Sequence, residues 1–233
     1  MISFAIGIIS VFSILYYSMG GHFETYLQWH SIILVICGTG ALFFVTTPQS
    51  ILKEVVRALV CLLKPDGQFF TVTIELQELM KSRSLSKTSG NELIRYACDL
   101  WTKGVEPDLF IVLLSERKVQ QDAKMAGATQ AFKNLAKYPP ALGMCGTVMG
   151  MISLFSALDS KKDNIGVSLS VAMTATFLGL FLSNFFLSPL ADRLHIKQMQ
   201  EARLSENIYE VLLLINRDEP AFLIQEEIND RAA

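Results

Sequence analysis

Two uncharged stretches in the second half of the chain hold the residues best suited to chemistry. In the first stretch, one face of a helix would carry Gly143, Thr147 and Gly150. In the second stretch, the same spacing joins Ala172, Thr176, Gly179 and Ser183. Each face would be small and would expose one or two hydroxyl groups. Hydroxyl and carbonyl oxygens can replace part of the hydration shell of a cation, so the two faces could border a path for an ion.

A second interpretation of the same pattern is close helix packing. Small residues let two membrane helices approach each other, and a threonine hydroxyl can bond the carbonyl four residues earlier in its own helix. Both interpretations remain open from the sequence. Neither stretch contains an acid, so the chain by itself offers no group that could bind a proton inside a membrane. An ion-driven process would therefore need a carboxylate from a partner.

Four apolar stretches have the length of transmembrane helices. A bilayer core requires about 20 residues of helix, and the stretches lack Asp, Glu, Lys and Arg. They are Ile2–Met19, Ile32–Thr47, Ala141–Leu158 and Ile165–Leu190. The first could be a signal peptide, but no basic segment precedes it and no small-residue cleavage site follows. We therefore expect four retained spans instead of buried helices of a soluble protein.

The distribution of basic residues predicts the orientation of these spans. Of 20 Lys and Arg residues, 13 lie in 49–137 and 5 in 191–233, which leaves 2 for the short loops at 20–29 and 159–164. Cytoplasmic segments carry the excess of positive charge, so both termini and the middle segment should be cytoplasmic. The net charge of -2 argues against binding to nucleic acid.

The cytoplasmic segments have helical periodicity. A helix over 91–104 should end at Gly104, and a long helix from Pro107 should continue into the third span with a bend at Pro139 and Pro140. The helix after the fourth span carries an apolar stripe and would pack against the helix from Pro107 as an antiparallel partner. The members of this stripe are Leu194, Met199, Leu204, Ile208, Val211, Leu212 and Ile215.

The predicted fold is an all-α membrane protein with four transmembrane helices, long cytoplasmic helical extensions and a small helical cytoplasmic domain. Residues 1–48 would hold spans one and two, and residues 138–190 spans three and four. Residues 49–137 would form the cytoplasmic helical domain, and residues 191–233 a cytoplasmic helix and tail.

Catalytic and metal-binding patterns are missing from the sequence. The three histidines lie far apart, the four cysteines have no C-x-x-C spacing, and neither a phosphate-binding glycine loop nor a nucleophile elbow occurs. We therefore expect no enzymatic activity, no metal site and no cofactor.

The sequence resembles a known family in three motifs. These are P-P-A-L-G-x-x-G-T-V-x-G-M-I at 139–152, V-A-M-T-A-T-F-L-G at 171–179 and S-P-L-A-D-R-L at 188–194. They are similar to motifs of the MotA/TolQ/ExbB family of ion-driven motor subunits. The four spans, the M-G-G at 19–21 and the long segment between spans two and three resemble its flagellar stator branch, MotA and PomA.

The resemblance implies roles for particular residues. Thr147 and Thr176 match positions on the ion pathway, and Pro140 and Pro189 match prolines that couple ion flow to torque. Thr147 is typical of sodium-using members, whereas Ala175 stands where those members have a threonine, with Thr174 one position away. The ion, H+ or Na+, therefore stays open. Candidates for contact with the rotor are Lys81, Arg83 and Glu92.

The resemblance also implies partners. An A-type stator subunit would form a pentamer around single-span MotB/PomB-like subunits that carry an aspartate, and it would push on a FliG-like rotor protein. Two alternatives remain. One is an ExbB/TolQ-like energiser of an outer-membrane or gliding system, which shares the ion path, and the other is a membrane scaffold without ion transit.

Overall fold

A computed structural model describes residues 2–18, 20, 28–62, 72, 74–79, 89–159, 165–217 and 220. These residues are helical or lie in turns, with no strand in the ranges just given. They fall into two compact units, one made of residues 1–55 and 128–193, the other of residues 56–127 and 194–233. The predicted all-α fold is confirmed.

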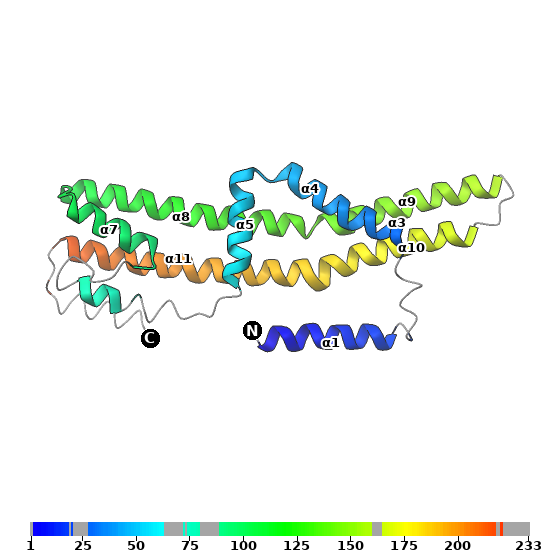
Figure 1. Cartoon of the computed structure of the whole chain (residues 1–233), viewed down its shortest axis with the longest axis horizontal. Coiled ribbons are helices and arrows are strands. Elements are labelled where there is room, and N and C mark those ends of the chain that lie inside the picture. The colour runs from blue at the N-terminus through cyan, green and yellow to red at the C-terminus, as the bar shows by residue number, and fades with distance from the viewer. Residues whose placement is uncertain are drawn as a thin grey trace. The chain divides into compact units, whose positions relative to one another are not determined.

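The first unit is built around a helical hairpin. Helices α9 (Tyr138–Asp159) and α10 (Ile165–Phe181) lie side by side, as the yellow-green and yellow ribbons of Figure 1 show. A helical run consisting of α3 (Trp29–Ile32), the π-helix η1 (Ile33–Cys37) and α4 (Gly38–Thr46) packs against this hairpin. Helix α1 (Ile2–Ser18) contributes Phe12, whose ring meets the rings of Phe181 and Phe186 edge to face.

Large apolar side chains cover the outer faces of this unit. Exposed examples include Val45, Ile152, Phe155 and Met173, of which Met173 is 70% exposed. A soluble protein rarely leaves so many apolar side chains in contiguous contact with water. These faces therefore suit lipid or neighbouring subunits.

Three helical segments, not the predicted four, are long and apolar enough to cross a membrane among the residues described. They lie within Trp29–Thr46, Pro107–Ser156 and Gly166–Asn216. The first predicted span is helix α1, whose 17 residues are close to the roughly 20 that a bilayer core requires. Its position across the membrane remains a prediction.

The long helix predicted to run through Pro139 and Pro140 is interrupted before the prolines. Helix α8 (Pro107–Leu135) ends, Ala136 and Lys137 form a turn, and α9 begins at Tyr138. Both prolines consequently occupy the first turn of α9. Proline is well tolerated there because the N–H groups of a first turn have no partner within the helix. The prediction of a bend within one helix was therefore wrong.

The second unit has its own apolar core, shared by α7 (Glu92–Thr102), α8, α11 (Ser188–Asn216) and a helical segment at 74–79. Its centre includes Leu79, Leu93, Phe110 and Leu212, all of them fully buried. Trp101 stacks on Phe110 at 5.2 Å between ring centroids. The antiparallel packing predicted for the cytoplasmic extensions is confirmed within this unit, since α8 and α11 both supply core residues.

Helix α7 has a capping residue at its start and a glycine at its end. The side chain of Asn91 accepts a hydrogen bond of 2.9 Å from the N–H of Leu93, which caps the first turn. Gly104 has a φ of 65°, and the N–H of Val105 bonds the carbonyl of Leu100. This is the glycine-based ending typical of helices, as the sequence predicted. Helix α5 (Gln49–Leu62) follows α4, and the π-helix η2 (Leu182–Leu187) lies between α10 and α11.

Candidate functional site

Glycines let α9 and α10 approach until their backbones touch. A Cβ atom on Gly143 would lie 2.9 Å from the carbonyl oxygen of Ala175, and one on Gly150 would lie 2.5 Å from the Cβ atom of Ala172. Gly179 fits as closely against the carbonyl of Pro139. Any side chain at these three glycines would force the helices apart. The small faces predicted from the sequence therefore face each other.

Thr147 and Thr176 meet at this contact between α9 and α10. Their hydroxyl oxygens are hydrogen-bonded to each other. The Thr147 hydroxyl also lies 3.1 Å from the carbonyl oxygen of Gly143 and 3.4 Å from that of Ala172. The Thr176 hydroxyl lies 3.2 Å from the same Gly143 oxygen. Four oxygens from two helices thus converge on one point.

This cluster of four oxygens, which we call the threonine cluster, is rich in electron pairs and poor in protons. Its two hydroxyls supply one proton each, whereas each hydroxyl or carbonyl oxygen has two lone pairs. Both threonines are partly exposed, so the cluster is not sealed inside the helix pair. Such a group of oxygens can accept a hydrogen bond from a protonated group or approach a cation. Close packing also accounts for the bonds that the hydroxyls make.

Two neighbours of Thr176 on α10, Thr174 and Ala175, contribute no oxygen to the threonine cluster. The Thr174 hydroxyl bonds only within its own helix, at 2.7 Å from the carbonyl oxygen of Ser170. Ala175 is fully buried and faces Gly146. A larger side chain at 175 would therefore meet α9 instead of entering the threonine cluster.

The two predicted coupling prolines lie at helix starts within the first unit. Pro140 is in the first turn of α9, and Pro189 is the second residue of α11. The π-helix η2 (Leu182–Leu187) ends two residues before Pro189. A proline ring clashes with the carbonyl four residues earlier in a regular helix, so the wider π-turn accommodates Pro189.

Of the three predicted rotor-contact residues, the structure describes Glu92. Lys81 and Arg83 lie outside the described residues. Glu92 is in the second unit, where it forms an ion pair with Arg117. The Arg117 guanidinium also lies 5.6 Å from the ring centroid of Tyr96.

Sequence reasoning missed two contacts of the first unit. One is the Gly146–Ala175 contact, because the helical spacing singled out other glycines. The other is a hydrogen bond from the Ser183 hydroxyl to the carbonyl oxygen of Ala136, at 2.5 Å. The Pro139–Pro140 pair was the available signal for this bond, since two consecutive prolines leave a carbonyl without a backbone donor.

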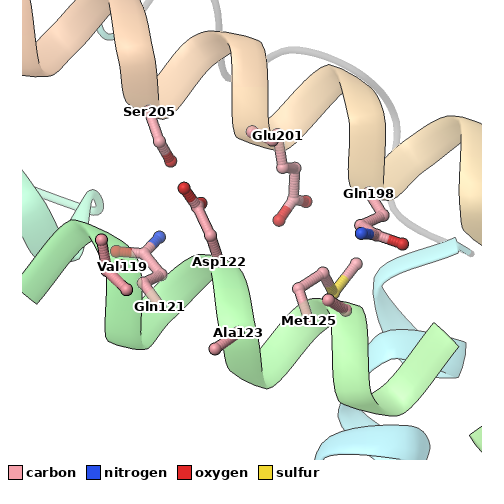
Figure 2. Close-up of a pocket in the computed structure, with 10 residues that line it drawn as sticks. Val119, Gln121, Asp122, Ala123, Met125, Gln198, Glu201 and Ser205 are labelled. Atoms are coloured by element: carbon pink, nitrogen blue, oxygen red, sulfur yellow. The ribbon is translucent and has the colours of Figure 1, made fainter. Parts of the chain in front are cut away.

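A cavity of about 350 Å³ lies between α8 and α11 in the second unit (Figure 2). Asp122 points across it toward Ser205, and Glu201 and Gln198 line the opposite wall. Burial raises the pKa of Asp122, with Glu206 adding to the rise and Lys118 opposing it. Within the described ranges, no group of three or more His, Cys, Asp or Glu side chains is placed to hold a metal ion.

The threonine cluster, and the turn at Ala136 and Lys137 that precedes the two prolines, lie within a segment that matches a known family. The MotA/TolQ/ExbB proton channel family matches residues 75–207, more than half of the chain. The chain belongs to this family. Membership in the MotA/TolQ/ExbB family identifies it as an inner-membrane protein of a class that conducts ions.

Relatives with similar sequences are proteins of bacterial motility. Motility protein A of Bacillus subtilis is 25% identical over 96% of this chain and 87% of its own length. Motility protein A of Treponema pallidum is 24% identical over 94% of this chain and 90% of its own length. Chemotaxis protein PomA of Vibrio alginolyticus is 31% identical, but the match spans only 48% of this chain and 44% of that protein.

Solved structures of the MotA/TolQ/ExbB fold resemble the chain over nearly its whole length. The C. jejuni MotAB structure has a TM-score of 0.81 at 16% identity, covering 98% of this chain and 94% of the other. The flagellar MotAB stator complex from Bacillus subtilis has a TM-score of 0.79 at 22% identity, with 97% and 94% covered. Family membership and these relatives support the predicted class, an A-type stator subunit of an ion-driven flagellar motor and not an enzyme.

Proposed function

We propose that this chain borders the ion path of a flagellar stator with the threonine cluster, and that a partner subunit supplies the carboxylate that carries the ion. The convergence of the Thr147 and Thr176 hydroxyls with two carbonyl oxygens carries this proposal. An aspartate on a neighbouring helix would alternate between charged and neutral forms as the ion passes. The hydroxyls would stabilise both forms, because each can donate to a carboxylate or accept from a carboxylic acid.

The partner is a single-span B-type subunit, and the A-type chains form a ring of five around a pair of B-type subunits. The solved structures of similar fold are complexes of MotA with MotB, which supports the partner. The helices described here between residues 29 and 187 contain no Asp, Glu, Lys or Arg in their membrane-spanning stretches. The chain therefore depends on the partner for a titratable group.

Ion transit would bias the ring between two positions around the partner pair. The cytoplasmic helices would transmit each step to a FliG-like rotor protein, with Pro140 and Pro189 at the joints and Lys81, Arg83 and Glu92 as rotor-facing charges. Both chain termini would be cytoplasmic, as the excess of basic residues in 49–137 and 191–233 indicates.

The transported ion is a proton or sodium. Thr147 favours sodium, because it adds a hydroxyl oxygen to the threonine cluster. Ala175 stands where sodium-using members of the family have a threonine, so by that resemblance it favours a proton. Comparing motility in sodium-free and sodium-rich buffer, with the partner co-expressed, distinguishes the two ions.

Three substitutions test the threonine cluster. Thr176→Val keeps the side-chain shape and removes the hydroxyl, whereas Thr176→Ser keeps the hydroxyl. If the hydroxyl contributes about 1.4 kcal/mol to ion transit, Thr176→Val lowers ion flux through the assembled stator about tenfold, and Thr176→Ser restores most of it. The matched control is Thr174→Val, which removes a hydroxyl that bonds only its own helix. Normal flux in Thr176→Val, or an equal loss in Thr174→Val, would leave helix packing as the role of these threonines.

A further inference from the structure

Ala136 has a carbonyl group that the backbone cannot satisfy. In a helix or a tight helical turn, this oxygen would accept a hydrogen bond from the N–H three or four residues later. Those residues are Pro139 and Pro140, and proline has no N–H. The turn at Ala136 and Lys137 therefore leaves an acceptor that needs a donor from elsewhere.

Ser183 supplies that donor from η2. Its hydroxyl donates to the Ala136 oxygen at 2.5 Å, and the serine itself is only 4% exposed. One turn earlier on the same face, Gly179 lies directly against the carbonyl of Pro139. Two residues of one helical run thus contact the turn between α8 and α9. Ser183 does so by a hydrogen bond and Gly179 by close packing.

One side of this turn faces a cavity. A cavity of about 400 Å³ borders it, with Ala136, Pro140 and Ser183 in its wall beside Gln130, Lys133 and Asp192. Atoms that face a cavity lack packing partners on that side. The bond from Ser183 is therefore the specific restraint on the position of the turn on its cavity side.

We infer that Ser183 is a positioning residue whose hydroxyl replaces the backbone donors that Pro139 and Pro140 lack, and so fixes the turn from which α9 begins. The consequence for torque rests on the proposed function, because it assumes that Pro140 couples ion flow to movement. The structural part does not rest on it. Ser183 acts through the turn and touches neither the threonine cluster nor the ion.

A double-substitution cycle in the complex with the B-type subunit tests the structural part. Ser183→Ala removes the hydroxyl, and we expect the thermal midpoint of the purified complex to fall by about 2–4 °C. Pro140→Ala restores an N–H four residues after Ala136, which can bond the same oxygen. In that background, Ser183→Ala should lower the midpoint by less than half as much. Ser188→Ala, which removes another hydroxyl from the wall of the same cavity, serves as the matched control.

Each outcome of the cycle either supports or overturns the inferred role of Ser183. A fall that depends on Pro140 supports it, and slower exchange of backbone hydrogens over 141–147 in the wild type than in Ser183→Ala supports it independently. An equal fall in both backgrounds would mean that Ser183 stabilises something other than the proline turn. No fall in either background, or an equal fall in Ser188→Ala, would also overturn it.

Rotation and ion flux, measured side by side, test the consequence for torque. Ser183→Ala should slow the rotation of tethered cells while ion flux through the stator stays near the wild-type level. Loss of flux together with rotation would overturn the positioning role. If Thr176→Val shows normal flux while the double-substitution cycle succeeds, the proposed ion path fails and the role of Ser183 in the turn stands.

Discussion

Ala175 and Gly146 pack so closely that a Cβ atom on Gly146 would lie 2.5 Å from the Cβ atom of Ala175. No pair of real Cβ atoms approaches to that distance, so one of the two residues must be glycine. The side chain of Leu34 would also lie 3.0 Å from a Cβ atom on Gly146. The contact explains why position 175 carries a small residue, and it ties the helix that precedes α4 to the α9–α10 hairpin.

Gly146→Ala should weaken the fold of the first unit. The added methyl group has no space and Ala175 cannot rotate away, so we expect a loss of about 1–3 kcal/mol, typical of an overpacked contact. The thermal midpoint of the complex and the yield of the chain in membranes measure this loss.

Gly40→Ala is the control for this prediction. A Cβ atom on Gly40 meets nothing within 4 Å, and alanine favours helix over glycine by about 1 kcal/mol. Gly40→Ala should therefore leave stability unchanged or raise it. Equal effects of the two substitutions would contradict the view that the Gly146–Ala175 contact limits the fold.

Pro140→Ala and Pro189→Ala should lower torque more than they lower assembly. Each alanine restores an N–H and relaxes the constraint on φ. The backbone at the start of α9 or α11 can then continue as a regular helix from the preceding residues. The glycine contacts between α9 and α10 remain intact. Rotation of tethered cells reports torque, and co-purification with the B-type subunit reports assembly.

The comparison between rotation and co-purification decides the role of the prolines. A parallel loss of both would mean that the prolines serve assembly. Unchanged rotation would mean that they have no part in coupling. The Ser188→Ala variant provides a neighbouring substitution in α11 that leaves the prolines in place.

Expressed without its partner, the chain should conduct neither protons nor sodium. Threonine hydroxyls offer no titratable group to relay charge across a membrane. Vesicles that contain only this chain should therefore retain an imposed pH or sodium gradient as long as empty vesicles do. Faster decay of the gradient would show that the chain forms an ion path by itself.

Asp122→Asn should stabilise the second unit at neutral pH. Burial raises the pKa of Asp122 above its ordinary value of 3.8, so the folded state holds this proton more tightly than the unfolded chain does. Stability therefore falls as pH rises through the raised pKa, because the charged carboxylate disfavours the folded state. Asparagine removes this penalty. The midpoint should rise at pH 7, and the gain should shrink as the pH falls toward 4.

Asp108→Asn is expected to change the thermal midpoint at pH 7 in the opposite direction to Asp122→Asn. Asp108 lies in the first turn of α8, where a negative charge stabilises the helix. Its replacement should lower the midpoint at pH 7. If both variants shift the midpoint in the same direction, the environment of Asp122 does not have the effect that its burial implies.

Local patterns in the sequence were sufficient for the helices and their faces. Apolar length marked the spans, and the spacing of Gly143, Thr147 and Gly150 marked the face that packs on α10. Gly104 marked the end of α7. Each of these features depends on residues within a few turns of one another, so hydropathy and helical period determine them.

Contacts between distant helices were decided only by the tertiary structure. Met199 was expected in the buried stripe of α11 and is 47% exposed, because the packing of α11 on α8 selects a narrower face than its periodicity does. The meeting of Thr147 with Thr176, and of Ser183 with Ala136, depends on how far one helix slides along another. That register is set by the closest contacts of the whole unit, such as Gly146 on Ala175, and no single segment of the sequence contains both partners.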